Sequence, residues 1–341
     1  MSTADAVAGV LWIGATLYAV FGGADFGAGV WSLLAGGDER GARARGLVDW
    51  AIGPVWEANH VWLIFVLVVL WTGFSVAFES IMSTLFIPLS LAALGIVLRG
   101  SGFAFHKLAR QLRYRRLAER VFGLFSLLTP FFMGTVVGAI ASGHVPVGNA
   151  AGDAVTSWLN LVSVLTGALF VATGAYLSAV FLVSDARRAN DPDLERYFAT
   201  RALIAALVTG AIAVAGIFVY RADARYIYDG LTSEGLPLVI ASALFGLGVL
   251  ALLWRGERRG TRPLAVGAVV AVIWGWGVAQ FPYLLPQTLT IKDGAGASAT
   301  LTGVLIVFGV AVVVVLPALG FLYTLAQRSV LDGEGEAPQA R

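Results

Sequence analysis

Four ionisable residues interrupt apolar segments of this sequence: Asp25, Glu57, His60 and Arg99. An ionisable side chain inside a membrane is costly unless it is paired, hydrated or neutralised, so each of these residues is a functional candidate. Glu57 and His60 are three residues apart, which places them on one face of a helix. Burial biases a carboxylate towards its protonated form and a neighbouring arginine opposes that bias, as a proton relay requires. We therefore predict a proton path through these four residues.

A structural role is the alternative for the same residues. Asp25 or Glu57 could pair with Arg99, or bind neighbouring backbone groups, and so only lock the packing of the helices. Small residues around Asp25, in the glycine-rich segment 21–29, would let a neighbouring helix approach closely. The residues alone leave both interpretations open.

Haem or metal binding by this chain is not predicted. The sequence has no cysteine, which excludes disulfides, thiolate metal sites and iron-sulfur clusters. Its three histidines are expected at different depths: His60 inside a helix, His106 just outside one and His144 beyond the opposite end of another. No two of them have the spacing or matched depth that a shared haem iron needs. Any redox centre in this chain would have to use other ligands.

The composition predicts an all-α integral membrane protein. Of the 341 residues, 58% are hydrophobic and only 13% are charged, and apolar runs recur along nearly the whole chain. Runs of about 20 apolar residues are long enough to cross a bilayer as helices. We expect a single polytopic membrane domain over residues 1–331 and a disordered tail over 332–341. The nine expected transmembrane helices span residues 7–34, 53–77, 81–105, 121–142, 158–183, 202–220, 236–254, 264–281 and 302–325.

The basic residues predict the orientation of these helices. Of the 23 Lys and Arg residues, 20 lie in one set of alternate loops and three in the other. The positive-inside rule then places the N-terminus outside and the C-terminus in the cytoplasm. The basic segment 103–120 is read as a solvated loop or as an amphipathic helix against anionic lipid headgroups. The formal net charge of +2 gives no reason to expect a nucleic-acid partner.

Three sequence motifs resemble those of subunit II of cytochrome bd-type quinol oxidases. They are Gly-Ala-Asp-Phe-Gly at 23–27, Trp-Glu-Ala-Asn-His-Val-Trp at 56–62, and Phe-Pro-Tyr-Leu-Leu-Pro at 281–286 followed by Leu-Thr-Ile-Lys-Asp at 289–293. The second motif is the most specific, and the resemblance covers essentially the whole chain. The first motif departs from the family pattern at Ala24, where an aromatic residue is more usual.

The resemblance implies a role within a larger complex of the bacterial plasma membrane. In this family, subunit I carries haems b and d and the quinol site, while subunit II has no haem and supports assembly and proton delivery. Asp25 and Glu57 match acidic positions of the family's proposed proton channel, and Arg99 matches a basic one. A structural quinone, a bound lipid and a small accessory subunit are left open.

Two other functions remain as alternatives. A proton-coupled secondary transporter would also place a carboxylate near the midplane, as Asp25 is expected to be. Against it, the later acids Asp223, Asp229 and Asp293 are expected in external loops. A purely structural assembly subunit would leave Asp25 and Glu57 dispensable.

Overall fold

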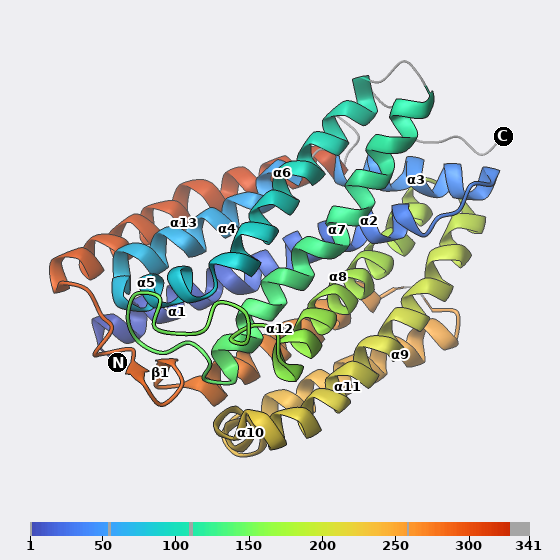
Figure 1. Ribbon diagram of the computed structural model, residues 1–341. Helices are drawn as coiled ribbons and strands as arrows, with labels where there is room; N and C mark the ends of the chain where they lie inside the picture. Colours follow the sequence, from blue (N-terminus) through green and yellow to red (C-terminus); the bar gives the residue numbers. More distant parts are fainter. Residues whose placement is uncertain (1, 54–55, 109–111, 258, 328–341) are drawn as a thin grey trace.

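The computed structural model describes residues 2–53, 56–108, 112–257 and 259–327 as a bundle of long helices (Figure 1). Among these residues, eight helices are long and apolar enough to cross a membrane, and a bent pair makes nine when it counts as one span. The elements are α1 (Thr3–Leu17), the π-helix η1 (Tyr18–Gly22), α2 (Gly23–Leu33), α3 (Glu39–Ile52), α4 (Trp56–Gly73), α5 (Ser75–Thr84), α6 (Phe86–Leu108), α7 (Leu112–Ala141), α8 (Leu161–Arg188), α9 (Pro192–Asp223), α10 (Arg225–Thr232), α11 (Leu236–Trp254), α12 (Thr261–Gln280), β1 (Tyr283–Leu285), β2 (Leu289–Thr290) and α13 (Ser298–Gln327).

The predicted all-α membrane class is confirmed. The seventh predicted helix, 236–254, has the bounds of α11, and most of the other spans are longer at one or both ends than predicted. For example, α9 begins ten residues before its predicted start, because Asp191 caps it and Pro192 occupies its first turn. The single domain over 1–331 stays a prediction, and the predicted tail 332–341 lies outside the described residues.

The first span consists of three consecutive elements, α1, η1 and α2. Ser2 starts it with a capping box: its hydroxyl accepts from the backbone N–H of Asp5, and the Asp5 carboxylate accepts from the Ser2 N–H. The π turn interrupts the helix directly before the segment that contains Asp25. Such turns are rare and occur often at functional sites.

The bounds predicted for the second and third helices are wrong. Helix α4 ends at Gly73, the short helix α5 turns away by 119°, and α6 begins only at Phe86. At the break, the side chain of Phe74 is fully buried and the backbone N–H of Gly296 donates to the carbonyl oxygen of Gly73 at 2.8 Å. The interruption is stable because a distant segment supplies a partner for the helix end.

Helix α3 was predicted only as a loop. Asp38 caps its start, and its buried face consists of Gly41, Ala44, Leu47, Val48 and Ile52. Arg43 on the same helix pairs with Asp191, which in turn accepts from the backbone N–H of Leu194 at the start of α9. This ion pair ties α3 to the bundle, although α3 is too polar to enter a membrane.

The bundle has two distinct ends, which Figure 1 shows at the two sides of the view. Helix α3 lies at one of them, here named the α3 end, together with the ends of α2 and α6 and the start of α7. The start of α1, the start of α13, the helix α10 and the antiparallel pair β1–β2 lie at the other, named the α10 end. The short strands were not foreseen. The first described helix begins and the last one ends at opposite ends of the bundle, as an odd number of spans requires.

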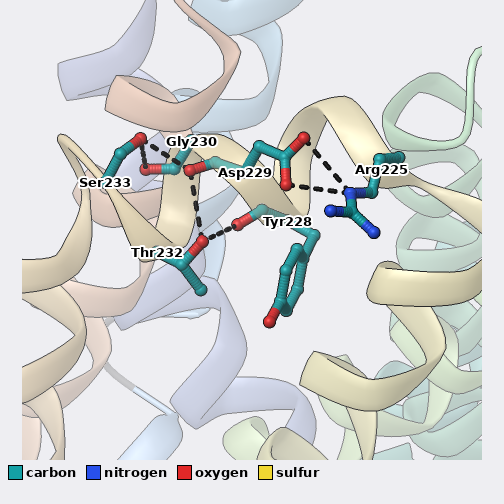
Figure 2. Close-up of polar contacts among 6 residues, drawn as sticks. All are labelled: Arg225, Tyr228, Asp229, Gly230, Thr232 and Ser233. Atoms are coloured by element: carbon teal, nitrogen blue, oxygen red, sulfur yellow. Dashed lines mark hydrogen bonds and ion pairs between the residues drawn. The ribbon is translucent and has the colours of Figure 1, made fainter.

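Helix α10 closes its own end of the bundle. Its inner face buries Ile227 and places Gly230 against the backbone of Ala279 in α12. On its outer face Arg225 pairs with Asp229 at 2.9 Å, and the hydroxyls of Thr232 and Ser233 donate to backbone carbonyls of the same helix (Figure 2). These exposed polar groups satisfy one another locally, so α10 is a structural cap.

Close packing between α2 and α8 depends on two glycines. A Cβ at Gly27 would collide with the carbonyl oxygen of Gly174, so the two backbones are in direct contact. The glycine-rich segment around Asp25 is therefore required by a helix crossing.

We expect Gly27→Ala to destabilise the protein by about 1–3 kcal/mol, because α2 and α8 must separate to admit the methyl group. The measurement is the thermal melting temperature of the purified protein in detergent. Gly9→Ala in α1 is the matched control, since a Cβ there has no heavy atom within 4 Å. Equal melting temperatures for the two variants would refute the packing argument.

A second expectation concerns Asp191 at the α3 end. Burial by itself would raise the pKa of this carboxyl, but hydrogen bonds from Arg43 and the Leu194 N–H outweigh it, so the pKa is lowered. The stability that Asp191 contributes is therefore present at neutral pH and is lost as the pH falls through the lowered pKa. Asp191→Ala should cost roughly 1–2 kcal/mol at pH 7 through loss of the helix cap. Melting curves at neutral and strongly acidic pH test this, because the difference from the unaltered protein should shrink in acid.

Candidate functional site

A buried ion pair joins α2 to α6 in the interior of the bundle. Nη2 of Arg99 lies 2.9 Å from Oδ1 of Asp25, and each side chain is only 1% exposed. The same Nη2 also donates to the backbone carbonyl oxygen of Asp25 at 3.1 Å. Asp25 lies eight residues before the end of α2, which is about 12 Å along the helix axis. The structure therefore has the Asp25–Arg99 pairing that the structural alternative expects, and the proton path through these residues stays a prediction.

The rest of the arginine is held by α7 and by two aromatic rings. Nε of Arg99 donates to the hydroxyl of Ser126 at 2.9 Å, and that hydroxyl donates to the carbonyl oxygen of Phe122 at 2.7 Å. The guanidinium carbon lies 4.9 Å from the ring centres of both Phe26 and Phe122. These contacts stabilise the cation in a dry environment.

Gly29 makes this arrangement possible. A Cβ at this position would occupy the place of the Ser126 side chain, so α2 must have glycine where it faces the serine. Ser126, Phe26 and Phe122 were missed by the sequence analysis, because serine and phenylalanine are ordinary residues in apolar helices. Only the glycine spacing at 27 and 29 hinted that α2 has close neighbours on two sides.

His60 lies beside the ion pair, behind an aromatic ring. Its ring centre is 5.9 Å from that of Phe26, 6.3 Å from that of Trp56 and 6.4 Å from that of Tyr18, the first residue of the π turn. Among the described residues, Nδ1 of His60 is buried without a hydrogen-bond partner. The third predicted residue is thus close to the pair, without a direct polar contact to it in the described part of the chain.

The remaining candidates are placed only in part. The backbone of Glu57 lies in the first turn of α4, and its side chain lies outside the described residues, as does that of His106. His144 lies exposed at the α10 end, where its Nδ1 is 2.8 Å from the hydroxyl of Ser142. Within the described residues there is no group of three or more His, Cys, Asp or Glu side chains that could hold a metal ion. The prediction that this chain binds no haem stays a prediction.

Asp25 has the chemistry of a proton-carrying group. Oδ1 lies 2.9 Å from Arg99 as an ion pair, and among the described residues neither Oδ1 nor Oδ2 accepts a hydrogen bond. A proton added to Oδ2 would neutralise the carboxylate while Arg99 keeps its hydrogen bonds to Ser126 and to the Asp25 carbonyl.

A family model described as cytochrome bd terminal oxidase subunit II matches residues 3–326. The chain belongs to this family. It is therefore a component of a quinol oxidase complex of the bacterial plasma membrane, and the predicted resemblance is confirmed. Membership also favours this function over a secondary transporter.

Individual relatives agree with the family. A putative cytochrome bd menaquinol oxidase subunit II from Bacillus subtilis strain 168 is 23% identical over 331 residues, which cover 94% of each chain. The cytochrome bd ubiquinol oxidase subunit 2 of the same strain is 28% identical over 152 residues, or 42% of each chain. The bd oxidase structure from Geobacillus thermodenitrificans contains a chain that is 26% identical with a TM-score of 0.75, covering 95% of this chain and 98% of that one.

Removing one partner of the buried pair tests its energetics. Arg99→Met should destabilise the protein by about 3–5 kcal/mol, because it leaves the Asp25 carboxylate buried without a counter-charge. Adding Asp25→Asn to that variant should restore part of the loss, since the remaining side chain is neutral. Thermal melting of both variants provides the comparison, and a double variant no more stable than Arg99→Met would show that the charge is not the cause.

Proposed function

We propose that this chain is subunit II of a bd-type quinol oxidase, where it supports assembly of a haem-bearing subunit I and delivers protons for oxygen reduction. Proton delivery is supported above all by the buried ion pair of Asp25 and Arg99, whose side chains are each 1% exposed. An ion pair of this kind is costly to bury and is weak support for stability alone. The chain belongs to the oxidase subunit II family, and reduction of oxygen to water by such a complex consumes protons, which the pair could help to deliver.

The proposed orientation places the α3 end in the cytoplasm. Basic residues are concentrated in the loops and short helices of that end, including Arg40, Arg43 and Arg45 of α3. Under the positive-inside rule the N-terminus is then external and the C-terminus is cytoplasmic. Asp25, Glu57, His60 and Arg99 fall in the half of the bundle nearest the cytoplasm, which suits uptake of protons from that side.

The division of labour between the subunits is also part of the proposal. Haems b and d and the quinol site belong to subunit I, and this chain contributes no redox group of its own. The dispersed histidines of this chain support that assignment. Its relatives are described as subunits of a menaquinol and a ubiquinol oxidase, so the proposal is a quinol oxidase without a choice of quinone.

In the proposed path, protons from the cytoplasm pass by way of Asp25, Glu57, His60 and Arg99 towards the partner subunit. Arg99 holds Asp25 in place through the ion pair. The ring of Phe26 contacts both Arg99 and His60, so transfer over that stretch requires an intervening water or a movement of the ring.

We expect Asp25→Asn and Glu57→Gln each to slow quinol oxidation and proton uptake by at least about tenfold while the complex still assembles. The complex is purified through a tag on this chain, and a reduced-minus-oxidised spectrum with haem b and d bands establishes assembly. Asp193→Asn is the matched control, because that exposed carboxylate starts α9 at the same end of the bundle.

Unchanged turnover and proton uptake in both variants would leave a structural assembly role as the function of the chain. A chain that purifies without haem bands would contradict the oxidase proposal itself.

A further inference from the structure

At the α3 end a small cavity lies between four helices. Its volume is about 10 Å³, which is room for about one water molecule. Its walls contain charged side chains, a hydroxyl and two aromatic rings, so a water inside would have the several polar partners it needs. The lining residues are Ser32 of α2, Arg45 and Asp49 of α3, Phe103 of α6, and Glu119 and Phe122 of α7.

The outer rim of the cavity reaches the surface. Nε of Arg45 lies 3.7 Å from Oε2 of Glu119, and these two side chains are 21% and 22% exposed. Asp49 is half-buried on the same helix as Arg45. The rim therefore carries two carboxylates and one guanidinium group, of which Glu119 and Arg45 reach solvent.

The inner wall of the cavity is the ring that covers Arg99. Phe122 is 4% exposed, lines the cavity, and lies 4.9 Å from the guanidinium carbon of Arg99. Phe103 packs beside it with ring centres 5.8 Å apart. A single aromatic layer thus separates the cavity from the ion pair.

A hydroxyl lies on each side of this layer. Ser32 lines the cavity, and Gly29, three residues earlier on the same face of α2, packs against Ser126. Ser126 in turn accepts a hydrogen bond from Nε of Arg99. Ser32 of α2 is therefore the hydroxyl on the cavity side of the layer, and Ser126 of α7 is the hydroxyl on the side of the ion pair.

We propose that this cavity is the water site through which protons reach Asp25 from the cytoplasm, with Asp49 and Glu119 as the groups that collect them. The inference rests on the proposed proton delivery and orientation, and adds residues on α3 and α7 to the path. A rim carboxylate takes a proton from bulk water and passes it to the cavity water, which releases one inward. Only O–H bonds form and break, so no other reactant is needed.

The charged groups around this water define its chemistry. Arg45, Asp49 and Glu119 surround it, and Arg99 lies behind the ring of Phe122. Arg45 holds Glu119 near the mouth, while the fixed positive charge of Arg99 opposes the passage of a free cation. In the proposal, protons therefore cross this stretch by transfer between hydrogen-bonded groups.

The test uses the whole oxidase complex in vesicles whose medium faces the α3 end. Asp49→Asn combined with Glu119→Gln should slow proton uptake and oxygen consumption by about tenfold at alkaline pH, and a tenfold higher proton concentration should restore the rate. The pH profile of turnover should therefore shift by about one unit towards acid. Glu39→Gln is the matched control, since that carboxylate is exposed on α3 outside the cavity.

A second variant blocks the water without removing a charge. Ser32→Leu fills the cavity and should slow proton uptake with both carboxylates present. The conservative pair Asp49→Glu and Glu119→Asp keeps both acids and should keep the rate. Haem spectra of the purified complexes show that slow variants are assembled.

The outcomes separate this inference from the proposed function. If Asp25→Asn is slow while the double rim variant and Ser32→Leu keep the normal rate and pH profile, the cavity is only a structural water site and this inference is wrong. If Asp25→Asn is also unaffected, the proposed proton delivery fails with it. Slow rim variants whose rate does not recover in acid would equally overturn the role of the carboxylates as proton collectors.

Discussion

The interaction on which the described site depends is the contact of Asp25 with Arg99. Two side chains at 1% exposure carry opposite charges in a bundle of apolar helices, and each is the counter-charge of the other. The pair requires α2, α6 and α7 to pack together at the same level of the bundle, and the glycines of α2 let its neighbours approach closely enough. Gly27 meets the backbone of α8, and Gly29 leaves room for the serine that holds the arginine. The glycines of the motif around Asp25 thus allow close helix packing, and Asp25 itself provides the buried charge.

Much of the fold could be predicted from the sequence, because membrane thickness fixes how long an apolar run must be. Helix α11 illustrates this: a proline near its start and a polar segment beginning at Arg255 define both ends. The break at Phe74 could not be predicted in the same way, because the Thr72, Gly73 and Ser75 beside it are also tolerated inside transmembrane helices. At the break the Gly73 carbonyl accepts a hydrogen bond from the backbone N–H of Gly296, more than two hundred residues later in the chain.

The candidate site divides along similar lines. Ionisable residues are conspicuous in apolar segments, so Asp25 and Arg99 could be found from the sequence. Their expected positions in the same half of the membrane suggested that they could be neighbours. The groups that surround them could not be found in this way, because their roles arise from tertiary contacts: Ser126 differs from other helical serines only in facing a glycine across a helix interface. Helix α3 could not be predicted for a similar reason. Its mixed composition is typical of a loop, and it is tied to the bundle by the tertiary ion pair of Arg43 with Asp191.

The π turn at Tyr18–Gly22 has a geometric consequence for the first span. A π turn holds one residue more than an α turn, so the segment before it is rotated by about 100° relative to an unbroken helix. In this setting α1 directs Trp12 onto Trp276 of α12, where the rings stack with centres 5.1 Å apart, while α2 directs Asp25 onto Arg99 of α6. The two halves of this transmembrane segment therefore face different directions around its axis. The extra residue lets α1 pack on α12 while α2 turns Asp25 towards α6.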